Sequence, residues 1–411
     1  MTRHRAVFFL SYVWALLILA TAMAGNCTEL TSGTSPVATS ELIVRSVAYP
    51  GDTARLDRVM EKALRGEPLT LGVVGGSITE GGVASSVDKR WANRVAAWWT
   101  ATFPKSKLTF VNAGLGATGS NIGAHRVQRD LLCHKPDFVV IEFAVNDNCT
   151  SGAMETMEGL VRQILALPNQ PAALMLCTMH QDGMNTQPFH DLIGRYYGLP
   201  IISYRDALWP EIQAGRIKWS DIAGDHVHPN DLGHQYLAEF VTGYLKQTLA
   251  HLFEAKNLPA IKPLPKPLIS DIYARTAWWD GANLKPARNQ GWQVSDPTPP
   301  PKTFGKCWVA DKPGSTMELE VEGAALTMLY YSEKADLGMA EVRVDGGAPE
   351  KLDAWFPMSW GGYTAFRSIG HDLTPGRHQI QITLLKEKAP ASKGHRFEIR
   401  AILAAGLKDI R

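Results

Sequence analysis

Between residues 41 and 255, short apolar segments alternate with longer segments in which apolar residues recur at helical spacing. Short apolar runs are typical of buried strands, and strands that alternate with helices form a parallel sheet covered on both faces. We therefore predict an α/β domain with three layers, α/β/α, over residues 46–255. The expected strands are 69–75, 108–112, 137–143, 172–177 and 199–203, and the expected helices are 54–64, 87–103, 121–132, 153–167, 188–197 and 231–254.

A proline-rich segment, residues 256–268, ends this pattern and is typical of a semi-rigid linker. Beyond it, apolar and polar residues alternate with a period of two, as in residues 317–321, 340–345 and 378–382. Such alternation, interrupted by glycine turns, predicts an antiparallel β-sandwich of the jelly-roll kind over residues 269–411. A chain of 411 residues is long enough for two such cores.

The N-terminus has the pattern of a secretory signal. Arg3 and Arg5 precede an apolar stretch over residues 6–20, and Ala22-Met23-Ala24 has the small residues of a cleavage site. We predict a signal peptide over residues 1–24, a polar segment over 25–45, and a secreted or periplasmic protein. An uncleaved anchor helix is the alternative, because residues 6–24 approach the length of a membrane span.

Charge gives no reason to expect a polyanionic partner. The sequence has 42 Lys and Arg against 40 Asp and Glu, and removal of residues 1–24 takes away two arginines and no acidic residue. The mature chain would then be formally neutral, without the positive charge that attracts nucleic acid or anionic lipid. We expect no nucleic-acid partner, and no stable membrane partner after cleavage.

Five cysteines, at positions 27, 133, 149, 177 and 307, are too few and too scattered for a disulfide scaffold or a metal site. We predict no bound metal. Cys177 lies within an expected strand and is interpreted as an inert core thiol. Cys133 and Cys149 flank one expected strand, and the sequence leaves open whether they pair.

Residues suited to acyl transfer follow the expected strands. Ser77 lies in a glycine turn directly after residues 69–75, and Asp225 and His228 lie three positions apart before the last expected helix. Serine becomes a nucleophile near neutral pH when an imidazole takes its proton and a carboxylate orients that imidazole. Alone, the turn would be an ordinary strand-to-helix connection, and Asp-x-x-His an ordinary solvated loop. A phosphate-binding loop is disfavoured, because neither Gly-Lys-Ser/Thr nor G-x-G-x-x-G occurs there.

Four short blocks, residues 75–79, 112–119, 139–147 and 225–229, are more specific together than singly. Their order and spacing resemble those of the SGNH hydrolases, also called GDSL-type esterases, over roughly residues 65–255. The resemblance implies that Ser77 is the nucleophile, His228 the base and Asp225 the acid that orients it, without a cofactor. The family's usual Gly-Asp-Ser is Gly-Gly-Ser in this chain, which removes a side chain but keeps the hydroxyl.

The resemblance also implies an oxyanion hole, the set of donors that stabilises the negative oxygen of the transition state. Asn146 matches the family's side-chain donor, and the N–H of Ser77 is an expected backbone donor. The family's usual glycine donor falls at Ala117, with Gly116 directly before it. We predict Gly116 as the further backbone donor, with Ala117 as the alternative.

Other polar residues are interpreted as structural. Glu142 and Asp147 are expected to make structural hydrogen bonds rather than to line the pocket, and His226 is expected to face away from the serine. His180 and His190 have no acid at matching spacing and are expected on the surface or in the core. An aromatic cluster in the C-terminal domain is expected to be mostly core, with a sugar-stacking platform as the alternative; its members are Trp355, Phe356, Trp360, Tyr363 and Phe366.

Taken together, these features predict a secreted serine esterase that hydrolyses short acyl esters, with O-acetyl groups on a carbohydrate or polysaccharide as the expected substrate. The expected partner is an acylated carbohydrate or a small ester substrate. An O-acyltransferase that uses the same residues is one alternative. A carbohydrate-binding protein with a silent esterase fold is the other, and the intact set of Ser77, Asn146, Asp225 and His228 argues against it.

Overall fold

A six-stranded sheet forms the centre of the first domain, in the order β1-β6-β5-β4-β2-β3. The computed structural model describes residues 36–297, 305–358 and 362–408, so the predicted signal segment lies outside the described residues. Five strands are parallel, and only β1 runs antiparallel, at the edge beside β6. The strands are β1 (Val47–Tyr49), β2 (Leu69–Gly75), β3 (Leu108–Gly114), β4 (Phe138–Glu142), β5 (Ala172–Cys177) and β6 (Ile201–Ser203).

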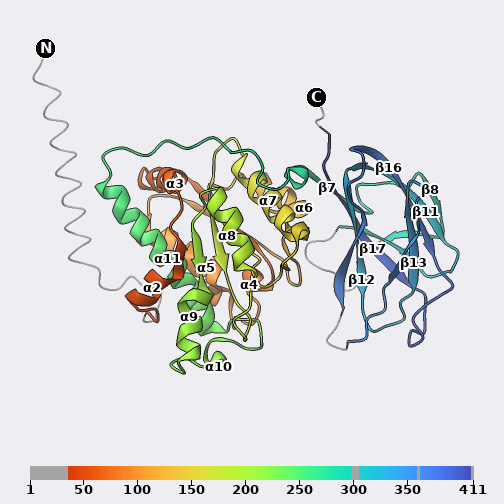
Figure 1. Cartoon of the computed structure of the whole chain (residues 1–411), viewed down its shortest axis with the longest axis horizontal. Coiled ribbons are helices and arrows are strands. Elements are labelled where there is room, and N and C mark those ends of the chain that lie inside the picture. The colour runs from red at the N-terminus through yellow and green to blue at the C-terminus, as the bar shows by residue number, and fades with distance from the viewer. Residues whose placement is uncertain (1–35, 298–304, 359–361, 409–411) are drawn as a thin grey trace, which may run out of the picture. The chain divides into compact units, whose positions relative to one another are not determined.

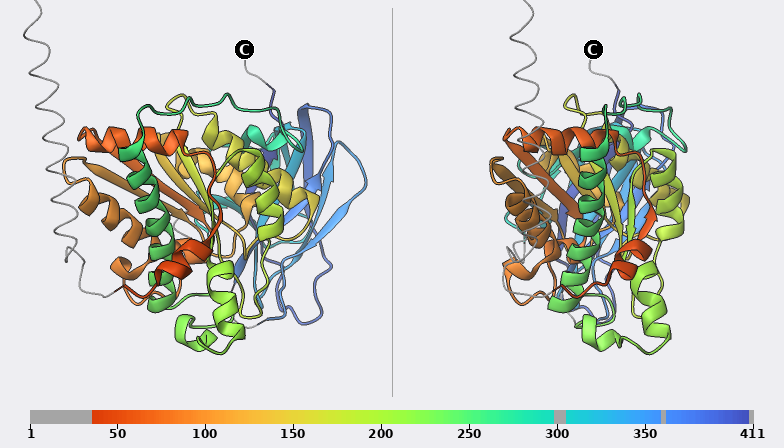
Figure 2. Two further views of the ribbon diagram at one scale, coloured as in Figure 1. Left: turned by 60° about the vertical axis from the view of Figure 1, so that its left-hand side comes forward. Right: turned by 90° about the vertical axis from the view of Figure 1, so that its left-hand side faces the viewer.

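Helices cover both faces of this sheet (Figures 1 and 2). One face carries α3 (Ala54–Leu64), α5 (Trp91–Thr102) and α11 (Asp231–Glu254), and the other carries α6 (Ser120–Asp130), α7 (Ser151–Leu165) and α8 (Gln187–Tyr196). Shorter helices complete the domain: α2 (Ser40–Ser46), α4 (Ser77–Glu80), α9 (Tyr204–Gln213), α10 (Trp219–Ile222), and the single 3₁₀ turns η1 (Val87–Lys89) and η2 (Leu132–His134). The predicted three-layer arrangement is confirmed.

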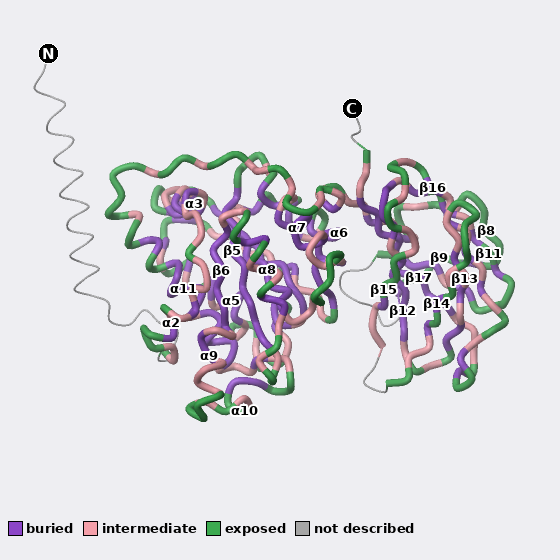
Figure 3. Tube along the Cα trace, viewed as in Figure 1, coloured by how far each residue is buried: buried purple, intermediate pink, exposed green. Residues whose placement is uncertain are grey.

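Burial explains why the strand segments are apolar. All five residues of β4 and all six of β5 are buried, and Figure 3 shows the strands as a buried interior beneath exposed turns. Strands enclosed on both faces need apolar side chains at every position rather than at alternate ones.

Several helices begin at side chains that accept their first free N–H groups. Thr39 caps α2, Thr150 caps α7 and Ser203 caps α9. Asn230 caps α11 by accepting from the N–H groups of Leu232 and Gly233 at 3.0 and 3.1 Å. This last cap matters for the site, because it fixes the end of the loop that carries Asp225 and His228.

The C-terminal domain is a β-sandwich of two antiparallel sheets. One has the order β15-β12-β17-β10-β9, with β7 also paired to β17, and the other has the order β14-β13-β16-β11-β8. Alternate residues of β11 and β16 point into the core, as the period of two predicts. After the 3₁₀ turn η3 (Ile272–Ala274), the strands are β7 (Thr276–Trp279), β8 (Arg288–Gln290), β9 (Gln293–Ser295), β10 (Cys307–Ala310), β11 (Thr316–Gly323), β12 (Ala325–Ser332), β13 (Met339–Val344), β14 (Glu350–Asp353), β15 (Tyr363–Gly370), β16 (Gly376–Leu384) and β17 (Phe397–Ala405).

Several short elements of the α/β domain were not expected from the sequence. Helix α2 occupies part of the segment described above as polar, and β1, α4, α9, α10 and the 3₁₀ turn η2 were not predicted. Strand β1 has three residues, too few for a period to be recognised, and α9 contains Pro210. Each of the five expected strands is present, and β2 and β5 have the expected bounds.

Candidate active site

Ser77 begins helix α4 directly after the carboxyl end of β2. Ligands of open parallel sheets gather at this edge, because the loops that follow the strands converge there. Gly76 precedes Ser77, and a Cβ atom placed on it would lie 2.1 Å from the side-chain oxygen of Asn146, so no side chain fits between these two segments as they stand.

Ser77, His228 and Asp225 form a continuous chain of hydrogen bonds. His228 Nε2 lies 2.8 Å from Ser77 Oγ, and His228 Nδ1 lies 2.7 Å from Asp225 Oδ2. The structure thus brings Ser77 into contact with His228, which lies 151 positions later in the sequence, in the same loop as Asp225. With Asp225 on Nδ1, the Nε2 atom is placed to take the hydroxyl proton.

Hydrogen bonds to Asp225 hold the loop in which it lies. Asp225 Oδ1 accepts from the N–H groups of Val227 and His228 at 2.7 and 2.8 Å. Trp219 Nε1 donates to the carbonyl of Asp225 at 2.6 Å. Partial burial alone would raise the pKa of Asp225, but the hydrogen bonds from His228 and Val227 outweigh it and lower this pKa to about 2. Asp225 is therefore ionised at neutral pH, the state in which it can stabilise an imidazolium.

Asn146 lies in the turn after β4, with its side chain against Gly76. Its Oδ1 atom is buried and has no hydrogen-bond partner among the described residues. The amide is therefore held by packing and by the backbone of its turn, where the N–H groups of Asn146 and Asp147 both donate to the carbonyl of Phe143, at 2.9 and 3.0 Å.

Gly116 also lies near the serine, since a Cβ atom on it would be 3.7 Å from Ser77 Cβ. Its N–H group, however, donates to Glu80 Oε2 at 2.9 Å. Ala117 has a φ of +56°, the left-handed conformation that favours glycine, and its N–H has no hydrogen-bond partner within the described part of the chain. The turn thus holds an alanine in a backbone conformation that favours glycine.

Glu142 is fully buried beneath the serine turn. Thr79 Oγ1 and Thr178 Oγ1 donate to its two carboxyl oxygens at 2.9 and 2.8 Å. Burial raises the pKa of Glu142 despite these two bonds. Its position is structural: it joins the first turn of α4 to the end of β5.

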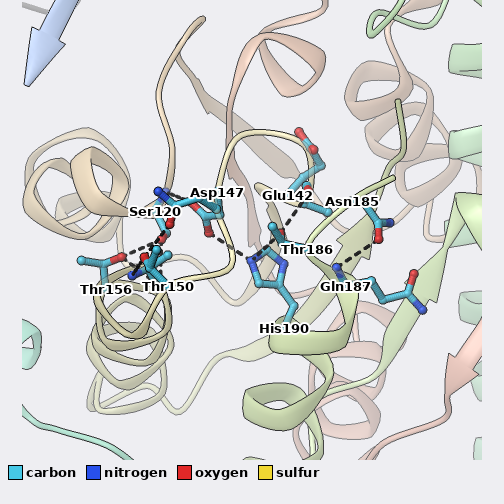
Figure 4. Close-up of polar contacts among 12 residues, drawn as sticks. Ser120, Glu142, Asp147, Thr150, Thr156, Asn185, Thr186, Gln187 and His190 are labelled. Carbon is cyan, nitrogen blue, oxygen red and sulfur yellow. Dashed lines mark hydrogen bonds and ion pairs between the residues drawn. The ribbon is translucent and has the colours of Figure 1, made fainter. Parts of the chain in front are cut away.

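Asp147 and His190 form a pair that sequence reasoning missed. His190 Nε2 lies 3.0 Å from Asp147 Oδ2, and both side chains are buried (Figure 4). The residues are 43 positions apart, on different elements, so no local spacing could have indicated their contact.

The two other histidines considered in the sequence lie in two loops that contact each other. The carbonyl of His226 accepts from the N–H of Gln181, and His180 is half-buried.

The remaining candidates carry no further site. No group of three or more His, Cys, Asp or Glu side chains among the described residues is arranged to hold a metal ion. Cys133 and Cys149 are free and exposed, and burial raises the pKa of the enclosed Cys177 well above its usual value. Within the same residues, no helix has the length and apolar character needed to cross a membrane.

The aromatic cluster of the C-terminal domain is divided between packing and exposure. Phe356 and Tyr363 pack edge to face with ring centres 4.9 Å apart. Phe366 is 53% exposed, and Trp360 lies outside the described residues.

Comparisons with known proteins identify the family of the chain. The model of the GDSL-like lipase/acylhydrolase family matches residues 73–236. A two-domain esterase active on acetylated mannans, crystallised with mannopentaose, is 32% identical, with a TM-score of 0.81 over 90% of this chain and 99% of that chain. A second structure of a two-domain esterase active on acetylated mannans is 32% identical, with a TM-score of 0.82 over 89% of this chain and 99% of that one. No curated protein sequence matches the chain significantly. The chain belongs to the GDSL-like lipase/acylhydrolase family, the SGNH hydrolases.

Proposed function

We propose that this protein is a serine esterase that removes O-acetyl groups from a carbohydrate, with an acetylated mannan as the favoured substrate. The observation that carries the proposal is the chain of hydrogen bonds Ser77–His228–Asp225. It lies in a chain that matches, over 99% of that protein's length, an esterase active on acetylated mannans. The side chain of His228 is 28% exposed, which suits an ester group that projects from a polymer rather than one enclosed in a deep pocket.

The first half of the reaction forms an acyl-enzyme. Ser77 Oγ attacks the acetyl carbonyl while His228 Nε2 takes the hydroxyl proton, and the ionised Asp225 stabilises the imidazolium that results. The tetrahedral intermediate then collapses. The bond from the acetyl carbon to the sugar oxygen breaks, and His228 returns its proton to that oxygen, which leaves as a free hydroxyl.

The second half regenerates the serine. A water molecule takes the place of the sugar, gives its proton to His228 and attacks the acetyl group on Ser77. Collapse of this second intermediate releases acetic acid and returns the proton to Ser77 Oγ. All proton transfers pass through one imidazole, which is why its orientation by Asp225 matters in both halves.

Asn146, the N–H of Ser77 and a backbone N–H of the turn after β3 stabilise the negative oxygen in each intermediate. One such donor contributes about 2.7–4 kcal/mol of transition-state stabilisation. For the turn after β3, Ala117 is favoured over Gly116, because Glu80 occupies the Gly116 N–H while Ala117 falls at the family's glycine position and has a conformation that favours glycine.

We also propose that the protein is exported, since its proposed polysaccharide substrate lies outside the cell. It is supported by the charged, apolar and small-residue regions of residues 1–24. N-terminal sequencing of the protein recovered from its producing cell would locate the cleavage predicted after Ala24.

The test compares the mature wild-type chain with Ser77→Ala on acetylated mannan, acetylated xylan and 4-nitrophenyl acetate. We expect acetate release from all three, fastest per acetyl group on mannan, and loss of release in Ser77→Ala. Release from 4-nitrophenyl acetate alone would refute the carbohydrate substrate but keep the esterase. Acetyl transfer to an added mannose oligosaccharide, in place of release to water, would identify an O-acyltransferase instead.

A further inference from the structure

The turn that carries Asn146 is tied to the rest of the domain by the residue that follows it. Both carboxyl oxygens of Asp147 are occupied: Oδ1 accepts from the N–H of Ser120 at 2.7 Å, and Oδ2 lies 3.0 Å from His190 Nε2 (Figure 4). The side chains of Asp147 and His190 are only 3% and 5% exposed. Because both side chains are enclosed, neither can contact a substrate that arrives from solvent.

These two bonds connect three separate elements. Ser120 begins α6 and lies three residues after Ala117, whereas His190 lies on α8. Asp147 therefore joins the turn that presents Asn146 to the turn that presents Gly116 and Ala117. The contact is close: a Cβ atom on Gly119 would lie 2.6 Å from Asp147 Oδ1, so only glycine admits the carboxylate at this distance.

Thr186, the residue directly before α8, holds the other end of the same turn. The N–H and Oγ1 of Thr186 both donate to the carbonyl of Ala144, at 2.8 and 3.0 Å. Thr186 Oγ1 also lies 3.4 Å from His190 Nε2, so both anchors belong to one cluster. The turn of residues 144–147 is thus held at its two ends by α8, with Asn146 between them.

Asn146 needs this support because its own side chain has none. Its Oδ1 atom lacks a hydrogen-bond partner among the described residues, so the direction of its amide depends on where the backbone places it. Donors in an oxyanion hole act only when held within about 0.5 Å of the productive position, and a misplacement of about 1 Å costs up to 10²-fold in rate.

We propose that Asp147 and His190 are positioning residues for the oxyanion hole, acting on the substrate only through Asn146 and the turn of residues 116–117. The proposal rests on the esterase function proposed above. It assigns to this buried acid–imidazole pair a task distinct from that of Asp225 and His228, since it moves no proton in the reaction.

The test uses the full mature chain and 4-nitrophenyl acetate. We expect His190→Leu to lower kcat by about 10- to 100-fold with KM changed less than about threefold, because the ester still binds while its transition state is less stabilised. His190→Gln should recover most of kcat, since its amide N–H can donate to Asp147. In an Asn146→Ala background, His190→Leu should lower kcat much less than it does in the wild-type chain.

A matched control separates positioning from stability. His378 in the C-terminal domain is also buried and lies 2.6 Å from Asp345, whose side chain is half exposed, so His378→Leu removes another acid–imidazole pair away from the serine. We expect it to lower Tm without lowering kcat of the folded protein. The proposal would be overturned if folded His190→Leu kept wild-type kcat, or if its effect and that of Asn146→Ala simply multiplied.

Hydrogen exchange gives a readout that does not depend on turnover. His190→Leu should speed amide exchange in both residues 112–121 and 143–149, whereas His378→Leu should not. If the wild-type chain proved inactive on every ester, the proposed function would fail while this coupling of the two turns still stood. Faster exchange confined to α8 would overturn the coupling itself.

Discussion

Gly76 offers the sharpest test of the site, because this is where the chain departs from the usual Gly-Asp-Ser of its family. A Cβ atom at this position would lie 2.1 Å from Asn146 Oδ1, 2.7 Å from its Cγ and 3.0 Å from its Nδ2. The φ of Gly76 is −86°, outside the left-handed region that favours glycine, and the contact that a side chain would meet is with Asn146. Gly76→Ala therefore displaces Asn146.

The size of the effect follows from these distances. The contact with Oδ1 must open from 2.1 Å to the 3.4 Å of an ordinary contact, a movement of about 1.3 Å. That exceeds the tolerance of about 0.5 Å for a preorganised donor. We expect Gly76→Ala to lower kcat by about 10²- to 10³-fold, the loss of one oxyanion donor, with a smaller change in KM. Gly76→Asp, which restores the family's usual motif, should lower kcat at least as far.

The assay is steady-state hydrolysis of 4-nitrophenyl acetate, with Ser77→Ala as the floor and thermal unfolding to confirm folding. Gly152→Ala is the matched control, since a Cβ atom on this residue of α7 would meet nothing within 4 Å. It should leave kcat unchanged. Retention of kcat within about threefold in folded Gly76→Ala would refute the packing of Asn146 against Gly76 as the support of an oxyanion donor.

Three further outcomes are expected. Glu80→Ala should lower kcat by roughly 2- to 12-fold, the worth of one hydrogen bond, if Glu80 holds the turn for Ala117; a rise in kcat would instead identify Gly116 as a donor that Glu80 blocks. Asp225→Asn should lower kcat by about 10⁴-fold. Because the pKa of Asp225 is lowered to about 2, the wild type should also be more stable than Asp225→Asn by an amount that is constant above pH 4 and shrinks as pH falls through about 2, in unfolding free energies measured against pH. For Glu142 the pKa is raised, so the wild type should lose stability relative to Glu142→Gln as pH rises above its usual 4.5, in chemical unfolding followed against pH.

The sequence predicted those parts of the fold whose burial can be recognised from the apolar character of the segment itself. Strand β2 is apolar at nearly every position because it is buried on both faces, so residues 69–75 were recognisable as a strand without knowledge of their neighbours. Strand β1 has three half-buried residues at the sheet edge, and its pairing with β6 is settled by a partner about 150 positions away. Nothing within such a segment distinguishes it from a loop.

The same distinction divides the site. Asp225 and His228 lie in one loop, so their spacing could be recognised in the sequence. Ser77 was recognisable from its glycine turn after an apolar strand, and the resemblance to a family connected it to the distant loop. Asp147 and His190 had neither advantage, since each lies on a separate element and only the packing of α8 against the turn after β4 brings them together. His190 has no acid at matching spacing in the sequence, so it was expected in the core or on the surface. Its contact with Asp147, 43 positions away, depends on the folded chain and could not be read from spacing.

The two departures from the family's motifs have opposite physical effects. Gly76 removes a side chain, and Asn146 packs into the space that results. Ala117 adds a methyl group at a φ of +56°, where a residue other than glycine is strained by roughly 1–3 kcal/mol. Such strain persists only when neighbouring bonds hold the backbone, and here Thr118 Oγ1 donates to Leu115 at 2.7 Å while the N–H of Ser120 donates to Asp147. The carboxylate beside Asn146 thus also bonds to the end of the strained turn, so both proposed donors should depend on the same buried acid for their positions.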